Sequence, residues 1–528
     1  MCLYKGATAI VPSVTATAKR FTQAAIATPH YLASEAGLAE LARGGNAVDA
    51  IVAANLVLGV VAPYYCGYGG DLFAIVWDGA LNGYLGSGRS PASASLEAVR
   101  DRHGNDAIVV GPQSVTVPGA VAGWFDLLER WGTRTFGDLA DDAIRHARDG
   151  FELSVFGGGA CEMYAPLYAE FDAWQAVYGA SHPGEVLHQP ALATLIEHLA
   201  AHGPTDYYQG SIASSIVRTL HEHGGLMEVS DLSTHAGEWC EPLLANYRGT
   251  QVAQLPPPTQ GVSALEILRI LEGFDFDTLD AVTRAHVMVE AVKLGLADRD
   301  AHVSDPQHMT APPADLLADD FIAKRRAAID LDLANNPITG HRQNGGTAYL
   351  CAADSDGLLV SLIQSNFLAF GSGVHVPKWG INLNNRGSSF SLDPSSVNVM
   401  APSKLPMHTL IPSMVLTDRS PSLVFGTMGG DAQAQVHAQV LSAVIDDDAD
   451  PQVAIDAPRW RVDVGDWTLR AEKGMDERVI DGLASRGHNV VRAPRHDSGM
   501  GHAHAIRVEA QGYAVATDPR AEGAALGL

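Results

Sequence analysis

The first residues of this sequence that could carry chemistry are Gly345-Gly346-Thr347. A threonine hydroxyl is a weak nucleophile unless a base lies beside it. If the chain is cut in front of Thr347, the new α-amine lies within reach of that residue's own hydroxyl, and an α-amine has a pKa of about 7.7–8.0. One residue then supplies nucleophile and base, and the two glycines leave room for attack on the carbonyl of Gly346. Without other support, these residues are typical of an ordinary strand start.

A second candidate lies at Gly429-Gly430, where an apolar run meets a helical pattern. Consecutive glycine N–H groups at the N-terminus of a helix form a ready anion site. An oxyanion hole needs this geometry. The alternative is a tight strand-to-helix turn that only glycine fits.

The elements that would position these residues are predicted from apolar periodicity and turn residues. Helices are expected over 34–42, 47–61, 120–131, 139–149, 190–202, 211–223, 265–271, 280–300 and 431–445, and strands over 72–77, 347–353, 358–365, 422–428, 502–509 and 513–517. Asp356-Gly357 predicts a hairpin that joins the strands on either side of it. Strands and helices around one large core indicate an α+β or layered α/β/α fold.

Composition narrows the class of protein. The chain has 528 residues, of which 46% are hydrophobic and 18% charged, which is enough for a large buried core. A net charge of −25 argues against a nucleic-acid partner. The five widely spaced cysteines show no disulfide framework or zinc spacing, so no metal and no cofactor are expected. Without a signal peptide or a stretch that could span a membrane, we expect a cytoplasmic protein.

Several motifs in the right order resemble the γ-glutamyltransferase family over nearly the whole chain. Besides Gly429-Gly430, they are Gly44–Ala50, Gly67–Gly70, Val117–Gly123, Phe370–Gly373, Asn384-Asn385, Ala457–Arg459 and Asp518–Arg520. The resemblance implies an αββα four-layer sandwich, the N-terminal-nucleophile hydrolase fold, and a proenzyme that cleaves itself after Gly346. It further implies a large chain, 1–346, and a small chain, 347–528. Together these would form one domain and a heterodimer, and a dimer of such heterodimers is a further expectation.

The resemblance also implies roles for single residues. Thr347 falls on the family's nucleophile, and Ser365 falls on the hydroxyl residue that activates it. Gly429 and Gly430 fall on the oxyanion pair. The alternative for Ser365 is a strand serine that faces its neighbour. The residues after the nucleophile depart from the family pattern of threonine and histidine, because Ala348-Tyr349 stand there.

The substrate-binding positions depart further. His408-Thr409 fall on a serine pair that grips the substrate carboxylate in glutathione-cleaving members. Phe367 replaces an asparagine that binds the substrate amino group. Arg386 and Ser389 replace a glutamine and an aspartate that hold the same group. The carboxylate-binding arginine corresponds to Arg89, with altered spacing to the next proline.

These departures predict a different acyl group. Loss of a carboxylate removes the partner of a substrate ammonium, and Arg386 adds a planar donor suited to a carboxylate. The alternative for Arg386 is a structural ion pair under the site. Asn385-Arg386-Gly387 and Ile363-Gln364-Ser365 resemble a subgroup that includes oxamate amidohydrolase and glutathione hydrolase-like proteins.

Three functional hypotheses follow. The first is an autoprocessed amidohydrolase that cleaves a γ-glutamyl or related small carboxylate-bearing amide through a threonyl acyl-enzyme, by hydrolysis or transfer. An oxamate-like anionic amide is the alternative substrate. The second hypothesis is a non-catalytic binding protein on the same fold. The third is a cysteine hydrolase that uses Cys66, although no histidine neighbours it in the sequence.

Overall fold

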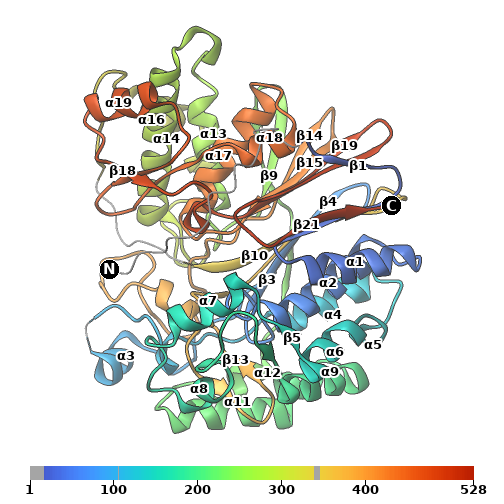
Figure 1. Ribbon diagram of the computed structural model, residues 1–528. Helices are drawn as coiled ribbons and strands as arrows, with labels where there is room; N and C mark the ends of the chain where they lie inside the picture. Colours follow the sequence, from blue (N-terminus) through green and yellow to red (C-terminus); the bar gives the residue numbers. More distant parts are fainter. Residues whose placement is uncertain (1–16, 105, 338–344) are drawn as a thin grey trace.

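The computed structural model describes residues 17–104, 106–337 and 345–528, and its centre is a pair of stacked antiparallel sheets (Figure 1). The first sheet has the order β1 (Lys19–Phe21), β20 (Gly512–Thr517), β19 (Ala503–Glu509), β15 (Ser420–Thr427), β14 (Ser413–Thr417), β9 (Thr250–Gln254) and β8 (Leu243–Tyr247). The second has the order β21 (Ala524–Gly527), β2 (Ala25–Thr28), β10 (Gly346–Ala353), β11 (Leu359–Phe367), β3 (Asp71–Trp77), β4 (Leu81–Gly86) and β7 (Glu238–Cys240).

Helices cover the outer face of each sheet (Figure 1). The first sheet carries α13 (Gly261–Leu271), α14 (Ala281–His302), α17 (Ala432–Ile445) and α18 (Pro451–Asp456), with α15 (Pro313–Leu316), α16 (Asp319–Ala327) and α19 (Glu477–Ser485) outside them. The second carries α1 (Tyr31–Ala42), α2 (Ala47–Val61) and α4 (Ala120–Trp131). The arrangement is the αββα four-layer sandwich, of α+β class, that the resemblance implies.

Further helices and short strands lie on the same side of the molecule as the helices of the second sheet (Figure 1). They are α3 (Leu96–His103), α5 (Phe136–Leu139), α6 (Asp141–Asp149), α7 (Val155–Tyr164), α8 (Asp172–Tyr178), α9 (Pro190–His202), α10 (Thr205–Gln209), α11 (Ser211–Glu222), α12 (Val229–Ser233) and the short pairs β5–β6 (Phe151–Glu152, Val186–Leu187) and β12–β13 (His375–Val376, Ile381–Asn382). A small sheet of β16 (Trp460–Val462), β17 (Leu469–Glu472) and β18 (Val490–Ala493) lies near α19.

Local sequence explains where the helices begin. Asn46 and Asp49 form a reciprocal capping box at the start of α2, and every residue of this helix is buried, as its apolar circumference requires. The helix α1 begins at Tyr31, earlier than the predicted residue 34, because the His30 side chain accepts a hydrogen bond from the N–H of Leu32. Ser34, the predicted start, is buried and bonded to the Thr28 hydroxyl at 2.9 Å instead.

The strand β3 shows why strands of these sheets appear in the sequence as unbroken apolar runs. Its side chains alternate between two buried layers: Leu72 packs with the helices, whereas Phe73 and Ile75 pack between the sheets. Both sheets contain strands from before and after Gly346, so the two stretches of chain share one core. Within the described residues, no helix is long and apolar enough to cross a membrane.

Candidate active site

Thr347 lies at the beginning of β10, beside a β-bulge in β11. Gly346 pairs with Phe367 and Ala348 pairs with Gln364, so two residues of β11, Ser365 and Asn366, face Thr347 alone. A bulge redirects side chains and is common beside active sites. The motif Gly67–Gly70 fits against this bulge, because a Cβ on Gly70 would lie 2.4 Å from the carbonyl oxygen of Ser365.

The hydroxyls of Thr347 and Ser365 form a short chain that ends on the peptide bond in front of Thr347. Thr347 Oγ1 donates to Ser365 Oγ at 3.3 Å, and Ser365 Oγ donates to the carbonyl oxygen of Gly346 at 2.6 Å. The N–H of Phe367 donates to Ser365 Oγ at 2.8 Å and fixes its position. Both hydroxyl residues are buried. The carbonyl that Thr347 would attack is therefore polarised by a hydrogen-bond donor.

Gly429 and Gly430 form the turn between β15 and α17. Their φ angles are +132° and +59°, a region that favours glycine. Their carbonyl groups accept from Ala432 N and Gln433 N, the first N–H groups of α17. In the described part of the chain, neither glycine N–H donates to a protein acceptor. A Cβ on Gly345 would lie 3.7 Å from Gly430 Cα, so the turn is next to the segment that leads into Thr347.

A buried network holds this turn. Arg299, on α14, binds the carboxylate of Asp431 and donates to Gln260 Oε1 at 2.9 Å. Gln260 Nε2 in turn donates to the carbonyl oxygens of Thr409 and Gly430, at 2.9 and 3.2 Å. Gln260 and Arg299 were not predicted from the sequence, because a single polar residue at a helix start and a single arginine in a helix carry no signal of partners far along the chain.

A third residue that the sequence did not indicate, Asp71, begins β3 directly opposite Ser365. Its Oδ2 accepts from Arg386 Nε at 3.1 Å, and the Arg386 guanidinium lies 4.3 Å from the ring centre of Phe367. Both charged side chains are fully buried. Burial raises the pKa of Asp71 to about 6, against the lowering effect of Arg386. The signal in the sequence was a carboxylate placed between a Gly-Gly turn and an apolar strand.

This pair leaves polar atoms without partners. Within the described residues, Nη1 and Nη2 of Arg386, Oδ1 of Asp71, Nδ1 of His408 and Oγ1 of Thr409 are buried and make no hydrogen bond. A buried unpaired polar group costs about 1–3 kcal/mol, so such groups in one place indicate a site for a polar ligand. Burial and the charge of Arg386 hold the pKa of His408 well below its usual value, so its imidazole is neutral.

Two predicted binding residues have other partners. The hydroxyl of Ser389 donates to the Arg386 carbonyl oxygen at 2.9 Å. Arg89 is partly exposed, forms an ion pair with Asp305 at 3.1 Å, and lines a small pocket with Ser87. Ser87 also bonds to Nε2 of His408, so this pocket lies behind the His408 ring.

A cavity of about 600 Å³ opens beside the candidate nucleophile. Gly345, Gly346 and Gly429 form one wall, and the remaining walls come from α7, from the loop before β3 and from residues 497–499. Cys66, the alternative nucleophile, does not line it. That thiol is fully buried, and burial raises its pKa far above the usual value, which leaves no thiolate at neutral pH.

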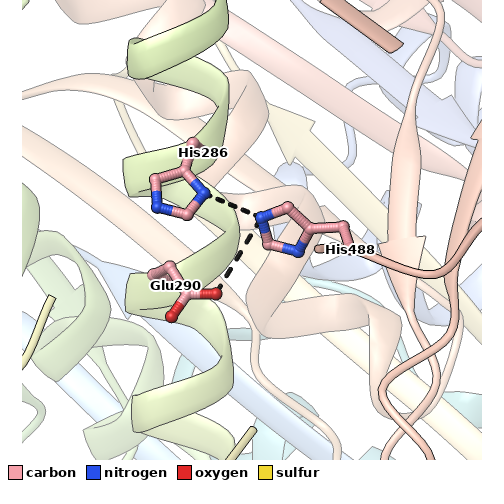
Figure 2. A group of neighbouring side chains, drawn as sticks. All are labelled: His286, Glu290 and His488. Carbon is pink, nitrogen blue, oxygen red and sulfur yellow. Dashed lines mark hydrogen bonds and ion pairs between the residues drawn. The ribbon is translucent and has the colours of Figure 1, made fainter. Parts of the chain in front are cut away.

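Figure 2 shows a separate buried group, His286, Glu290 and His488, whose side-chain atoms could face a cation. His286 Nε2 must donate to the Asp330 carbonyl oxygen at 2.7 Å, so its Nδ1 accepts from His488 Nε2 at 2.8 Å. His488 Nδ1 then accepts from the Lys293 ammonium at 3.3 Å. These bonds use the nitrogen atoms that a metal would need, so the group does not fit a metal site.

Instead, this group anchors the chain that leads toward Gly346. Lys293 Nζ donates to Glu290 Oε1 and to the carbonyl oxygen of Asn335, at 2.9 and 3.0 Å. Glu290 Oε2 accepts from Asn335 N at 3.0 Å. Trp467 Nε1 donates to the Pro337 carbonyl oxygen at 2.8 Å.

The chain is similar to known proteins over nearly its whole length. The family model for gamma-glutamyltranspeptidase matches residues 33–528. A glutathione hydrolase-like YwrD proenzyme of Bacillus subtilis is 36% identical, over 96% of this chain and 99% of that protein. An oxamate amidohydrolase proenzyme of Klebsiella pneumoniae is 34% identical, over 94% and 97% of the two chains.

Solved structures agree with the fold. A crystal structure described as a cephalosporin acylase from Bacillus halodurans has a TM-score of 0.94 and 34% sequence identity. The alignment covers 100% of this chain and 99% of that chain. The similarity therefore extends across both sheets and their covering helices.

Proposed function

We propose that this chain, which belongs to the gamma-glutamyltranspeptidase family, cuts itself between Gly346 and Thr347 and then uses Thr347 as its nucleophile. As a member of this family it is an enzyme, an autoprocessed amidohydrolase. The observation that carries the assignment is the hydroxyl chain from Thr347 through Ser365 to the Gly346 carbonyl oxygen.

Self-cleavage begins when Thr347 Oγ attacks the carbonyl carbon of Gly346. Ser365 donates its hydrogen bond to the oxygen on which negative charge develops. The C–N bond breaks as the nitrogen of Thr347 takes a proton, and an ester joins Gly346 to Thr347 Oγ. Water then hydrolyses this ester, which frees the Gly346 carboxylate and restores the Thr347 hydroxyl beside its new α-amine.

In the mature enzyme the same hydroxyl attacks a substrate amide. The α-amine of Thr347 takes the hydroxyl proton, and the N–H groups of Gly429 and Gly430 stabilise the oxyanion. The proton passes to the leaving amine, and the acyl group stays on Oγ. Water, activated by the same α-amine, releases the acid and restores Thr347.

Arg386 supports an anionic acyl group. Its two unpaired Nη groups match the two oxygens of a carboxylate. The Asp71 carboxylate is paired through one oxygen with Arg386 Nε, so it is partly neutralised and attracts a substrate ammonium less than a free carboxylate would. His408 and Thr409 supply further neutral hydrogen-bonding atoms. A short amide with a carboxylate, such as oxamate, fits these features better than a γ-glutamyl group, the second candidate from the names of the relatives.

We also propose that chains 1–346 and 347–528 stay together as a heterodimer. Each sheet is built from strands on both sides of the cut. Separation would break both sheets and expose the core between them.

The acyl assignment is tested with matured enzyme on oxamate, glutathione and γ-glutamyl-anilide. We expect the highest kcat/KM for oxamate and a loss of about 10- to 100-fold in Arg386→Gln, because a charge-assisted hydrogen bond contributes about 1.5–3 kcal/mol. Arg386→Lys, which keeps the charge but not the planar pair of donors, is the matched control and should recover only part of the loss. Efficient turnover of γ-glutamyl-anilide with no oxamate activity would contradict the assignment.

A further inference from the structure

We propose that the cavity of about 600 Å³ beside Gly346 and Gly429 binds the amine half of the substrate, and that it takes an aromatic or bulky apolar amine. The inference rests on the proposed function, since that amine is the group displaced by Thr347. It concerns the part of the substrate that the acyl-binding residues do not contact.

The position of the cavity points to the leaving group. A carbonyl carbon under attack has an oxygen, an acyl substituent and an amine. In the proposed mechanism the oxygen is bound by Gly429-Gly430, and the acyl substituent is bound by Arg386. None of Asp71, Arg386, His408 or Thr409 is among the described lining residues of the cavity, whereas Gly346 and Gly429 are. The amine is therefore the substituent left to enter this space.

The side chains that line the cavity favour an aromatic ligand. Tyr64, Tyr65 and Phe156 lie on one wall, with ring centroids of Tyr64 4.6 Å from Tyr65 and 5.7 Å from Phe156. At the helix α7, Val155 and Met163 are 83% and 71% exposed, although both are large and apolar. Aromatic and methionine side chains make favourable contacts with aromatic ligands. The volume lies in the usual range of about 300–1,000 Å³ for small-molecule sites.

Two charged side chains, Arg461 and Asp497, lie on the wall, and each has hydrogen-bond partners in the protein. Arg461 Nη1 donates to the Gly499 carbonyl oxygen at 2.7 Å, and its Nη2 donates to Asp463 at 3.0 Å. Asp497 accepts from the N–H of Gly499 at 2.8 Å. These bonds hold the loop 497–499 in place, so the walls favour an uncharged ring over an anionic or cationic amine.

Gly159 gives direct access to the cavity for a test. It lines the cavity from α7, and a Cβ at this position would meet no atom within 4 Å. Its φ is not in the left-handed region. The series Gly159→Ala, Gly159→Leu and Gly159→Trp therefore adds bulk to this wall in steps, starting from a Cβ with open space around it, and each replacement favours the helix over glycine.

The experiment measures kcat/KM for paired substrates that share an acyl group. The pairs are oxamate with N-phenyloxamate and glutamine with γ-glutamyl-anilide, each a primary amide and its anilide. In the wild-type enzyme we expect the anilide of the preferred acyl group to have the higher kcat/KM. The ratio of anilide to primary amide should fall stepwise along the series, by about 10-fold or more in Gly159→Trp. Conversion to two bands on a denaturing gel shows that each variant has folded.

The outcomes separate this inference from the proposed acyl group. A ratio that stays constant along the Gly159 series overturns the inference, whichever acyl group is preferred. A ratio that falls supports it, even if γ-glutamyl compounds turn out to be the better pair and the acyl assignment fails. If matured wild-type enzyme hydrolyses neither pair, both proposals are overturned together.

Discussion

On one side of Thr347, Asp71 and Arg386 form a fully buried ion pair that leaves polar atoms without partners among the described residues. On another side, Tyr64, Phe156 and the helix α7 surround an open and largely apolar cavity. A buried charge tolerates few ligands, because any group that does not pair with it leaves a large desolvation cost. An apolar wall distinguishes ligands only by size and shape, with small differences in free energy. The comparison implies strict selection of the acyl group and loose selection of the amine.

Thr347 acts on every substrate, whichever acyl group or amine it carries. The loss of Thr347 should therefore have the largest effect on activity. Thr347→Ala should lower kcat/KM by about 10⁴-fold or more for every amide, because it removes the nucleophile. It should also leave the chain as a single band of 55.7 kDa on a denaturing gel. Thr347→Ser keeps the hydroxyl and should still cleave itself. Two bands from Thr347→Ala would show that another group performs the cleavage.

Ser365 separates maturation from substrate selection. Ser365→Ala removes the donor to the Gly346 carbonyl oxygen, and we expect self-cleavage to slow by about 100-fold. The half-time of band conversion in purified precursor measures this rate. Ser365→Thr retains a hydroxyl and should recover much of it. Equal half-times for Ser365→Ala and the wild type would remove Ser365 from the cleavage step.

Asp71 belongs to the buried acyl-binding side, and its titration should make the binding of anions there depend on pH. Its pKa of about 6 lies above that of an unfolded aspartate, about 3.9. Protonation therefore stabilises the folded state; this contribution is complete below pH about 4 and is lost as the pH rises through 6. Below pH 6, Arg386 also keeps its charge without a neighbouring anion.

We therefore expect the inhibition constant of oxalate, a carboxylate probe of this pocket, to fall by about three- to tenfold between pH 7 and pH 5. In Asp71→Asn, which has no titratable group at this position, the dependence should disappear. Competitive inhibition measured at several pH values tests both. An unchanged pH dependence in Asp71→Asn would show that a group other than Asp71 controls the binding of the anion.

The anchor at Lys293 belongs neither to the Asp71–Arg386 pair nor to the cavity beside Gly346. Its loss should therefore change neither the choice of acyl group nor the choice of amine. Lys293→Met removes the donor to Glu290, His488 and Asn335 and should lower the free energy of unfolding by about 1–3 kcal/mol. Limited proteolysis should then cut faster within 330–337. The ratio of anilide to primary amide should remain that of the wild type. A changed ratio would show that the anchor influences the cavity.

Local patterns predicted most elements of the fold. The helices at 47–61, 120–131 and 190–202 have the predicted bounds, because caps, glycines and prolines define their ends. The start of α1 was predicted too late because His30 caps this helix, and histidine is an unusual cap. Between 139 and 149, the predicted helix is divided at Ala140 into α5 and α6.

The site was only partly predictable. Gly429-Gly430 and Thr347 carried local signals, and the resemblance supplied Ser365. The pairing of Asp71 with Arg386 joins residues 315 positions apart and depends on which strands neighbour each other, which no local pattern specifies. The bulge opposite Thr347 is likewise a property of two strands together. Arg386 combines both predicted alternatives, an ion pair with Asp71 and two free donors.

Self-cleavage in front of Thr347 is tested most directly by the N-terminal sequence and mass of the chains in active, purified enzyme. We expect a large chain that ends at Gly346 and a small chain that begins Thr347-Ala348-Tyr349. Active material with an intact bond between Gly346 and Thr347 would contradict it, because Thr347 would then have no free amine to accept its proton.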